Sequence, residues 1–219
     1  MPSRATAAAD NEATRQAVIE AARATVQQGL NRGTSGNISR RVGEGFVITP
    51  SALGYEAMQP DDVVLVTRSG EARGRRRPSS EWRLHHDIYA ARQDAGAVVH
   101  AHPPHATAIA CVRREIPAFH YMVAAAGGDS IRCAGYALFG TQALSDLALA
   151  ALADRRACLL ANHGIIALGA DLDAALRLAV EVEWLAHQYW AALQVGAPAL
   201  LNAAEMADVR DAFRDYRPS

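Results

Sequence analysis

The chain has 219 residues, half of them hydrophobic, and its 22 Lys and Arg nearly balance its 23 Asp and Glu, for a net charge of −1. This length and composition predict one domain with a full core, and the balanced charge argues against nucleic-acid and membrane-surface partners. The three cysteines form no Cys-x-x-Cys pair, and no apolar run approaches the roughly 20 residues of a membrane span, so we expect a cytoplasmic protein that acts on a small molecule.

The N-terminal part predicts a tail, a helix and three strands. The first ten residues are Ala-rich and are expected to be a flexible tail, which leaves 11–219 as the folded domain. Apolar residues recur at helical spacing from Asn11 to Gln28, and Gly29 follows where helices commonly end. Short β-like runs then predict strands at 37–42, 46–49 and 62–67. The cationic run that follows, 73–77, is interpreted as a solvated turn.

Pro78, Ser79 and Ser80 form a helix start signal, and the apolar face behind them predicts a helix to about Gln93 with Glu81 in its first turn. A strand follows and must end at Pro103, because proline cannot continue a paired strand. The remaining elements, in chain order, are expected to be a helix at 105–112, a helix at 141–153, strands at 158–161 and 165–168, and helices at 171–195 and 203–215.

Helices and strands therefore interleave along the chain. Several neighbouring strands are joined by connections too short for a parallel crossover, which requires a dozen or more residues. The predicted fold is a single-domain, layered α/β/α structure with a mixed, mainly antiparallel central sheet.

His100 and His102 are the strongest candidates for metal ligands. A strand points residues two apart to the same face, so both imidazoles would lie side by side at the end of the strand. Glu81, and His163 at a break between two strand-like runs, are candidates for the remaining ligands of a zinc site. The alternative is a polar stretch of strand that binds no metal.

Zinc held by three neutral imidazoles keeps its full charge, which suits the polarisation of a carbonyl group and the stabilisation of an enediolate. Glu81 at the edge of the metal could coordinate it at rest and then act as a base. Alternatively, Glu81 is only an acidic residue favoured by the helix dipole.

Three clusters of hydroxyls and flexible backbone amides predict a phosphate site. They lie at ends of elements, in residues 34–37, 49–51 and 79–80, and include Thr34, Gly36, Asn37, Ser51, Ser79 and Ser80. Each cluster alone could be an ordinary turn or helix cap. The other histidines, His85, His86, His105, His120 and His187, are expected to be surface or packing residues.

These motifs resemble the class II aldolase/adducin family, and within it the enzymes that cleave L-fuculose 1-phosphate. The similarity runs from about Ala17 to Tyr216 and is carried, in the same order, by residues 29–39, 78–83, 100–102, 119–128, 136–141 and 162–164. The resemblance implies a zinc-dependent lyase that reversibly cleaves a ketose 1-phosphate into dihydroxyacetone phosphate and a small aldehyde.

The resemblance also implies roles for individual residues. One Zn²⁺ per subunit would be held by His100, His102 and His163, with Glu81 as the resting ligand and proton-transfer group. Phosphate would be bound by the hydroxyl and amide clusters described above. Tyr121 would act in the site of the neighbouring subunit and Tyr216 near the C-terminus would be a second catalytic tyrosine, while Phe139 and Phe213 would line the pocket for the aldehyde tail. A homotetramer with active sites at its interfaces is implied.

Two departures from the fuculose enzymes leave the aldehyde open: Ala52 stands where a phosphate-facing turn has Gly, and Ala101 replaces an Asn between the two histidines. One alternative is an aldolase or dehydratase for methylthioribulose or 5-deoxypentulose 1-phosphate. Another is a sugar-phosphate 4-epimerase, although such enzymes carry Asp where Glu81 stands. A non-catalytic adducin-like binding module is disfavoured, because the candidate ligands are all present.

Overall fold

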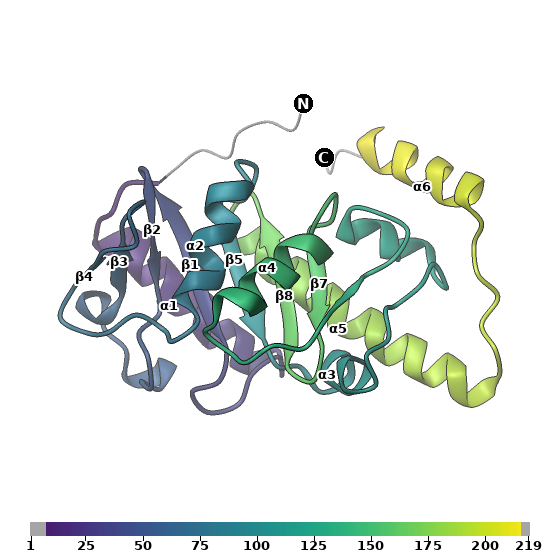
Figure 1. The fold of residues 1–219 in the computed structure, drawn as a ribbon, viewed down its shortest axis with the longest axis horizontal. Coiled ribbons are helices and arrows are strands. Elements are labelled where there is room, and N and C mark those ends of the chain that lie inside the picture. Colours follow the sequence, from purple (N-terminus) through teal and green to yellow (C-terminus); the bar gives the residue numbers. More distant parts are fainter. Residues whose placement is uncertain (1–7, 216–219) are drawn as a thin grey trace.

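The computed structural model describes residues 8–215 (Figure 1). Its helices are α1 (Glu12–Gln27), α2 (Trp82–Ala91), α3 (Pro104–Cys111), α4 (Gln142–Ala151), α5 (Leu172–Val195) and α6 (Ala203–Asp215), with short 3-10 turns η1 (Tyr55–Ala57), η2 (Pro60–Asp62) and η3 (Tyr121–Ala126). Its strands are β1 (Asn37–Val42), β2 (Gly45–Ile48), β3 (Val64–Val66), β4 (Ala72–Arg73), β5 (Ala97–Ala101), β6 (Cys133–Ala134), β7 (Ala157–Leu160) and β8 (Gly164–Gly169).

The strands form one sheet in the order β4-β3-β2-β1-β5-β8-β7-β6. Every neighbouring pair is antiparallel except β6 and β7, which are parallel. The predicted mixed, mainly antiparallel sheet is therefore confirmed.

Helices cover both faces of the sheet, as Figure 1 shows: α2 and α4 lie on one face, and α1 and α5 on the other. Alternation along β5 explains the two layers. Val99 and Ala101 belong to the core beneath α1, α3 and α5, whereas Val98 belongs to the core beneath α2 and α4. His100 shares a face with Val98, so its imidazole points toward the layer that contains α2.

Side-chain caps fix the starts of three predicted helices. Asn11, Thr141 and Asp171 each accept a hydrogen bond from the backbone N–H three residues later, at α1, α4 and α5 respectively. Gly29, just after α1, has a φ of 73°, the left-handed conformation that ends helices and that glycine adopts without strain.

The structure corrects two local expectations. Glu81 lies before α2 rather than in its first turn, because the Trp82 N–H bonds to the Ser79 carbonyl in a tight turn and the helix begins only at Trp82. The cationic run is not simply solvated. Residue 73 ends the edge strand β4, and Arg75 and Arg76 both pair with Asp62, which is 2% exposed.

Of the expected N-terminal tail, residues 1–7 lie outside the described residues, and Ala8 pairs with Val42 of β1. Within residues 8–215, no helix is both long enough and apolar enough to cross a membrane.

Candidate metal centre and substrate site

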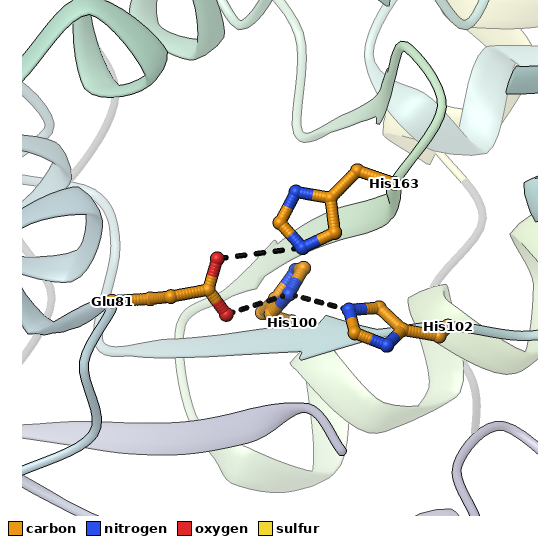
Figure 2. Close-up of side chains that lie close together, drawn as sticks. All are labelled: Glu81, His100, His102 and His163. Carbon is orange, nitrogen blue, oxygen red and sulfur yellow. Dashed lines mark hydrogen bonds and ion pairs between the residues drawn. The ribbon is translucent and has the colours of Figure 1, made fainter. Parts of the chain in front are cut away.

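Glu81, His100, His102 and His163 converge at one point, at the end of β5 (Figure 2). One potential ligand atom from each of the four lies within 4.8 Å of the others. The Glu81 carboxylate is 3.0 Å from Nε2 of His100 and 3.4 Å from Nε2 of His163, and Nε2 of His102 is 2.9 Å from Nε2 of His100. The four predicted ligands are therefore brought together from three separate segments of the chain.

His100 and His102 are oriented by groups outside the cluster. Nδ1 of His100 donates to the carbonyl of Ile165 on the neighbouring strand β8, at 2.9 Å, which directs Nε2 into the cluster. The backbone N–H of His102 donates to Oδ1 of Asn31, at 3.0 Å. The strand ends directly after them, since Pro103 and Pro104 lead into α3.

His163 reaches the cluster from the turn between β7 and β8. Asn162 adopts a φ of 56° in this turn, and its side chain bonds to Arg113 and to the Cys111 carbonyl. Gly164 then begins β8 so close to the end of β5 that a Cβ there would lie 2.4 Å from the carbonyl oxygen of Ala101 and 2.6 Å from the His102 ring. Only glycine allows this approach, which places His163 opposite His102.

The electrostatics favour a cation at the centre of the four side chains. Burial, with repulsion from His100, lowers the pKa of His102 to about 3, and the same causes lower the pKa of His163 to about 4. Both rings are therefore neutral near pH 7, the state that coordinates metal. Burial opposes ionisation of Glu81, but the charge of His100 and its hydrogen bond outweigh burial and hold the pKa of Glu81 below its usual range.

The residues present fit a divalent metal on two further observations. Oε1 of Glu81 is buried and accepts no hydrogen bond, although such orphaned acceptors are rare in folded proteins. Nε2 of His100 lies 2.9 Å from Nε2 of His102 and 3.0 Å from the Glu81 carboxylate, so three potential ligand atoms converge at contact distance. Three imidazoles and one carboxylate are a ligand set typical of catalytic zinc.

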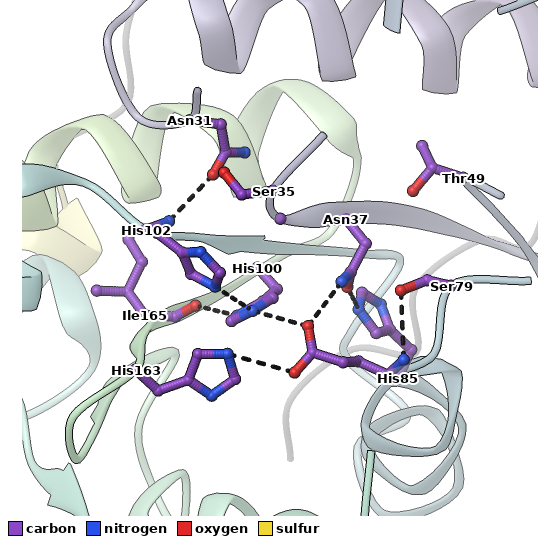
Figure 3. Close-up of polar contacts among 12 residues, drawn as sticks. Asn31, Ser35, Asn37, Thr49, Ser79, His85, His100, His102, His163 and Ile165 are labelled. Atoms are coloured by element: carbon purple, nitrogen blue, oxygen red, sulfur yellow. Dashed lines mark hydrogen bonds and ion pairs between the residues drawn. The ribbon is translucent and has the colours of Figure 1, made fainter. Parts of the chain in front are cut away.

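Two of the predicted phosphate residues, Asn37 and Ser79, lie on one side of this centre (Figure 3). Segments 49–51 and 77–79 run side by side, joined by hydrogen bonds from Ser51 N to Arg77 O and from Ser79 N to Thr49 O, each 3.1 Å long. Ser51 and Ser80 are exposed there, whereas Ser79 is buried and its Oγ accepts from the backbone N–H of Glu81. Asn37 pairs with His100 across β1 and β5, and its side chain donates to Oε2 of Glu81 at 3.0 Å.

The loop that contains Thr34 and Gly36 is pinned from two sides. The buried Tyr55 hydroxyl donates to the carbonyl of Gly36 at 2.9 Å, and the Asn31 side chain packs so closely on Gly36 that a Cβ would lie 2.4 Å from it. Thr34 is exposed at the tip of this loop. Ala52, the departure noted in the sequence, has a φ of 56°, so this turn keeps a left-handed conformation without glycine.

The remaining predicted residues lie away from the four-residue cluster. Tyr121 begins η3, is 49% exposed, and contacts His120 and Phe213, the latter on α6. Phe139 is 59% exposed in a segment that passes Ser80, since a Cβ on Gly140 would lie 2.8 Å from the Ser80 carbonyl oxygen. Tyr216 lies outside the described residues.

His85 was expected to be a surface or packing residue, but it is fully buried beside the site and bonds to Asn37 and Ser39. A signal for it exists in the sequence: His85 is four residues after Glu81, on the same side of a helix. Asn31, which holds the His102 backbone, was not identified either.

Comparisons with known proteins agree with this geometry. The model of the class II aldolase and adducin N-terminal domain matches residues 16–190. A 5-methylthioribulose-1-phosphate/5-deoxyribulose-1-phosphate aldolase from Rhodospirillum rubrum is 56% identical over 93% of this chain and 92% of its own length. An L-fuculose phosphate aldolase from Escherichia coli O6:H1 is 45% identical over 94% of this chain and 96% of its own length. A solved structure of an L-fuculose 1-phosphate aldolase superposes with a TM-score of 0.90 at 38% identity, covering 93% of this chain and 97% of that one.

The fold and the four-residue cluster thus define an enzyme of the metal-dependent lyase class. The chain belongs to the class II aldolase/adducin family.

Proposed function

We propose that this protein is a zinc-dependent aldolase that cleaves a ketose 1-phosphate into dihydroxyacetone phosphate and a small aldehyde. The observation that carries the proposal is the convergence of three histidines and Glu81 beside segments rich in hydroxyls and backbone amides. A bound divalent cation would supply Lewis acidity at the C2 carbonyl and its neighbouring hydroxyl.

Glu81 has the proton-transfer role in this proposal. Cleavage breaks the C3–C4 bond: C4 becomes the aldehyde carbonyl as its hydroxyl passes its proton to Tyr121 of a neighbouring subunit, and the electron pair of the bond passes to C3 and the C2 oxygen. Glu81 gives a proton to C3, which completes dihydroxyacetone phosphate, and takes one from C3 in the reverse direction. Burial of Glu81 supports the role, because water is largely excluded around the carboxylate.

We assign phosphate recognition to two groups of residues described above. One is the loop that contains Thr34, Gly36 and Asn37, and the other is formed by Ser51, Ser79 and Ser80 on the paired segments. Exposed hydroxyls at Thr34, Ser51 and Ser80 support direct contact with phosphate oxygens, whereas the Asn37 side chain is already bonded to Glu81. On binding substrate, Asn37 would either keep its hydrogen bond to Glu81 or exchange it for a bond to the phosphate.

Three substrates, from two kinds of aldolase, are supported by the relatives. The aldolase for 5-methylthioribulose 1-phosphate and 5-deoxyribulose 1-phosphate is 56% identical, and the L-fuculose phosphate aldolase is 45% identical. Tyr136, Leu138 and Phe139 are each more than half exposed in the segment that leads to Gly140, which passes close to Ser80, and this favours an aldehyde with an apolar tail. We therefore place 5-methylthioribulose 1-phosphate first and L-fuculose 1-phosphate second.

Assembly into a homotetramer completes the proposal. Tyr121 is exposed and makes no contact with the cluster within the described part of its own chain, which suits action on a neighbouring subunit. Trp184 and Trp190 on α5 are about half exposed, an unusual position for tryptophan on an isolated surface. Tyr216 and Phe213 would complete the aldehyde side of the site.

Substrate profiling tests the proposal. Purified protein is incubated with 5-methylthioribulose 1-phosphate, 5-deoxyribulose 1-phosphate and L-fuculose 1-phosphate, and dihydroxyacetone phosphate is measured for each. We expect cleavage of all three and the highest kcat/KM for the methylthio sugar. Failure to release dihydroxyacetone phosphate from any ketose 1-phosphate would contradict the proposed activity.

A further inference from the structure

A row of buried polar side chains connects Glu81 to the interior beneath α2. Asn37 and Ser39 are two residues apart on β1, and Glu81, His85 and Tyr89 are spaced by four along α2 and its N-terminus. Strand and helix periods therefore bring both sets to one β1–α2 interface. All five are buried, with exposed fractions between 0% and 6%.

The contacts run from residue to residue without a break. Tyr89 OH is 2.8 Å from Ser39 Oγ, and Ser39 Oγ is 2.6 Å from Nδ1 of His85. Nε2 of His85 bonds to Oδ1 of Asn37, and Nδ2 of Asn37 is 3.0 Å from Oε2 of Glu81. Figure 3 shows the end of this row nearest the metal centre, where the Asn37 side chain lies next to the His85 ring.

The chemistry of the groups fixes the direction of every hydrogen bond. A carboxylate only accepts, so the Asn37 amide nitrogen must face Glu81 and its oxygen must face His85. Nε2 of His85 therefore carries a hydrogen. Burial and then repulsion from His100 lower the pKa of His85 to about 3, so the ring is neutral and Nδ1 accepts from the Ser39 hydroxyl. Ser39 in turn accepts from Tyr89, whose pKa is raised by burial and which stays protonated.

We propose that Tyr89, Ser39, His85 and Asn37 form a one-directional hydrogen-bond chain that fixes Oε2 of Glu81 and leaves Oε1 as the oxygen that transfers the proton. Oε1 accepts no hydrogen bond and lies 3.4 Å from Nε2 of His163, which supports this division between the two oxygens. Donors aligned in one direction polarise one another and strengthen the last bond, the one to the carboxylate. His85 is the positioning residue of the chain, and its catalytic consequence rests on the proposed aldolase function.

The tautomer of His85 tests the chain without any assay of activity. Nitrogen-15 NMR of histidine-labelled protein reads which ring nitrogen carries the proton, and His85→Phe identifies the signals by their loss. If that variant does not fold, Ser39→Ala identifies them by their displacement. We expect a hydrogen on Nε2 and none on Nδ1 throughout the pH range in which the protein is folded. A hydrogen on Nδ1, or a charged ring near neutral pH, would overturn the chain.

The kinetics of two serine variants test the catalytic consequence of the hydrogen-bond chain. Ser39→Ala removes the donor to His85, whereas Ser145→Ala removes an equally buried hydroxyl on α4 that donates to Asp87 instead. We expect Ser39→Ala to lower the rate of C3 proton exchange in dihydroxyacetone phosphate about three- to tenfold, the size of one hydrogen bond. KM and metal content should not change, so the loss should appear in the maximal exchange rate alone, a split that a general loss of packing would not give.

Equal effects of the two serine variants would overturn the positioning role. If the wild-type protein cleaves no ketose 1-phosphate, the proposed function fails, while the NMR result still decides whether the chain exists. The two proposals are thus separable.

Discussion

The two oxygens of Glu81 have different surroundings, and this difference organises the centre at the scale of single residues. Oε2 accepts from Asn37 and lies 3.0 Å from His100, whereas Oε1 is buried without a hydrogen-bond donor. A carboxylate so placed lowers the stability of the fold, since each unsatisfied buried acceptor destabilises the fold by about 1–3 kcal/mol. Its retention points to function rather than to stability.

Replacement of Glu81 by Gln tests that role. The amide keeps the shape of the side chain but cannot accept a proton from C3, so Glu81→Gln should keep the fold and lower C3 proton exchange about 10²- to 10⁴-fold. Exchange is followed by loss of deuterium from labelled dihydroxyacetone phosphate. Glu181→Gln, an isosteric change at a half-buried position on α5, is the control and should retain the full rate. Undiminished exchange in Glu81→Gln would assign the base elsewhere.

The placement of individual side chains was predictable where the signal is local. The side-by-side position of His100 and His102 follows from the period of a strand and the proline after it, and their Nε2 atoms lie 2.9 Å apart. His85 was not predicted, because its partners Asn37 and Ser39 lie 46 or more residues away in the chain. Its spacing of four from Glu81 places it on the same side of a helix, but its burial depends on the packing of α2 against β1, which that spacing does not specify.

At the scale of elements, two glycines in one loop differ in a testable way. Gly33 and Gly36 both have positive φ, 63° and 77°, but only Gly36 has a neighbour that a Cβ would strike, the Asn31 side chain at 2.4 Å. Gly33→Ala should therefore cost only backbone strain, about 1 kcal/mol of unfolding free energy. Gly36→Ala should cost more and also raise KM for the phosphorylated substrate, because Asn31 holds the His102 backbone.

Urea unfolding and steady-state kinetics of these two variants measure the difference. Equal stability and equal KM in both would show that the contact between Gly36 and Asn31 has no influence on the site.

The buried Asp62 ties the segment after β4 to η2. It accepts from Arg76 at 2.6 Å, from Arg75 at 3.0 Å and from the Gln59 backbone at 2.9 Å. Burial opposes ionisation, but these donors outweigh it and lower the pKa of Asp62. Its contribution to stability should thus be complete above the ordinary aspartate pKa of about 3.9 and should disappear as pH falls through the lowered pKa.

Asp62→Asn should accordingly unfold at a lower temperature than the wild type at pH 7, with the gap closing in acid. Thermal unfolding across pH measures the gap, and Asp61→Asn, at the exposed neighbouring position, provides the matched control. A difference in unfolding temperature that stays constant down to the lowest pH measured would mean that the charge on Asp62 does not stabilise the fold.

The elements that the sequence predicted well are those with their own boundary signals. The helices α1 and α5 begin where predicted, capped by Asn11 and Asp171, and glycines precede β1 and form its turn into β2. The edge strands β4 and β6 have two residues each and exist only through pairing with distant strands, so no periodicity could reveal them. The sequence pattern placed the start of α2 too early, because it does not reveal the tight turn at Ser79. That turn accompanies the pairing of Ser79 with Thr49, a tertiary contact.

At the scale of the whole molecule, the placement of Tyr121 makes the proposed site incomplete in one chain. Tyr121→Phe should retain much of the C3 proton exchange, which depends on Glu81, while carbon–carbon bond formation falls steeply. Mixing Tyr121→Phe chains with Glu81→Gln chains should then restore part of the aldol activity, because hybrid assemblies contain sites with both wild-type groups.

Mass spectrometry verifies that subunits have exchanged in this mixture. Confirmed exchange without recovered activity would show that Tyr121 does not serve a neighbouring site. Each variant alone, taken through the same mixing procedure, is the control and should gain nothing.

The account as a whole depends on the four-residue cluster being a metal centre, and metal removal tests this most directly. Metal content and ketose 1-phosphate cleavage are measured on one sample of the protein before chelation, after chelation and after addition of Zn²⁺. We predict about one divalent metal per chain, loss of cleavage in proportion to metal removed, and recovery with zinc. Full cleavage by metal-free protein would contradict the account.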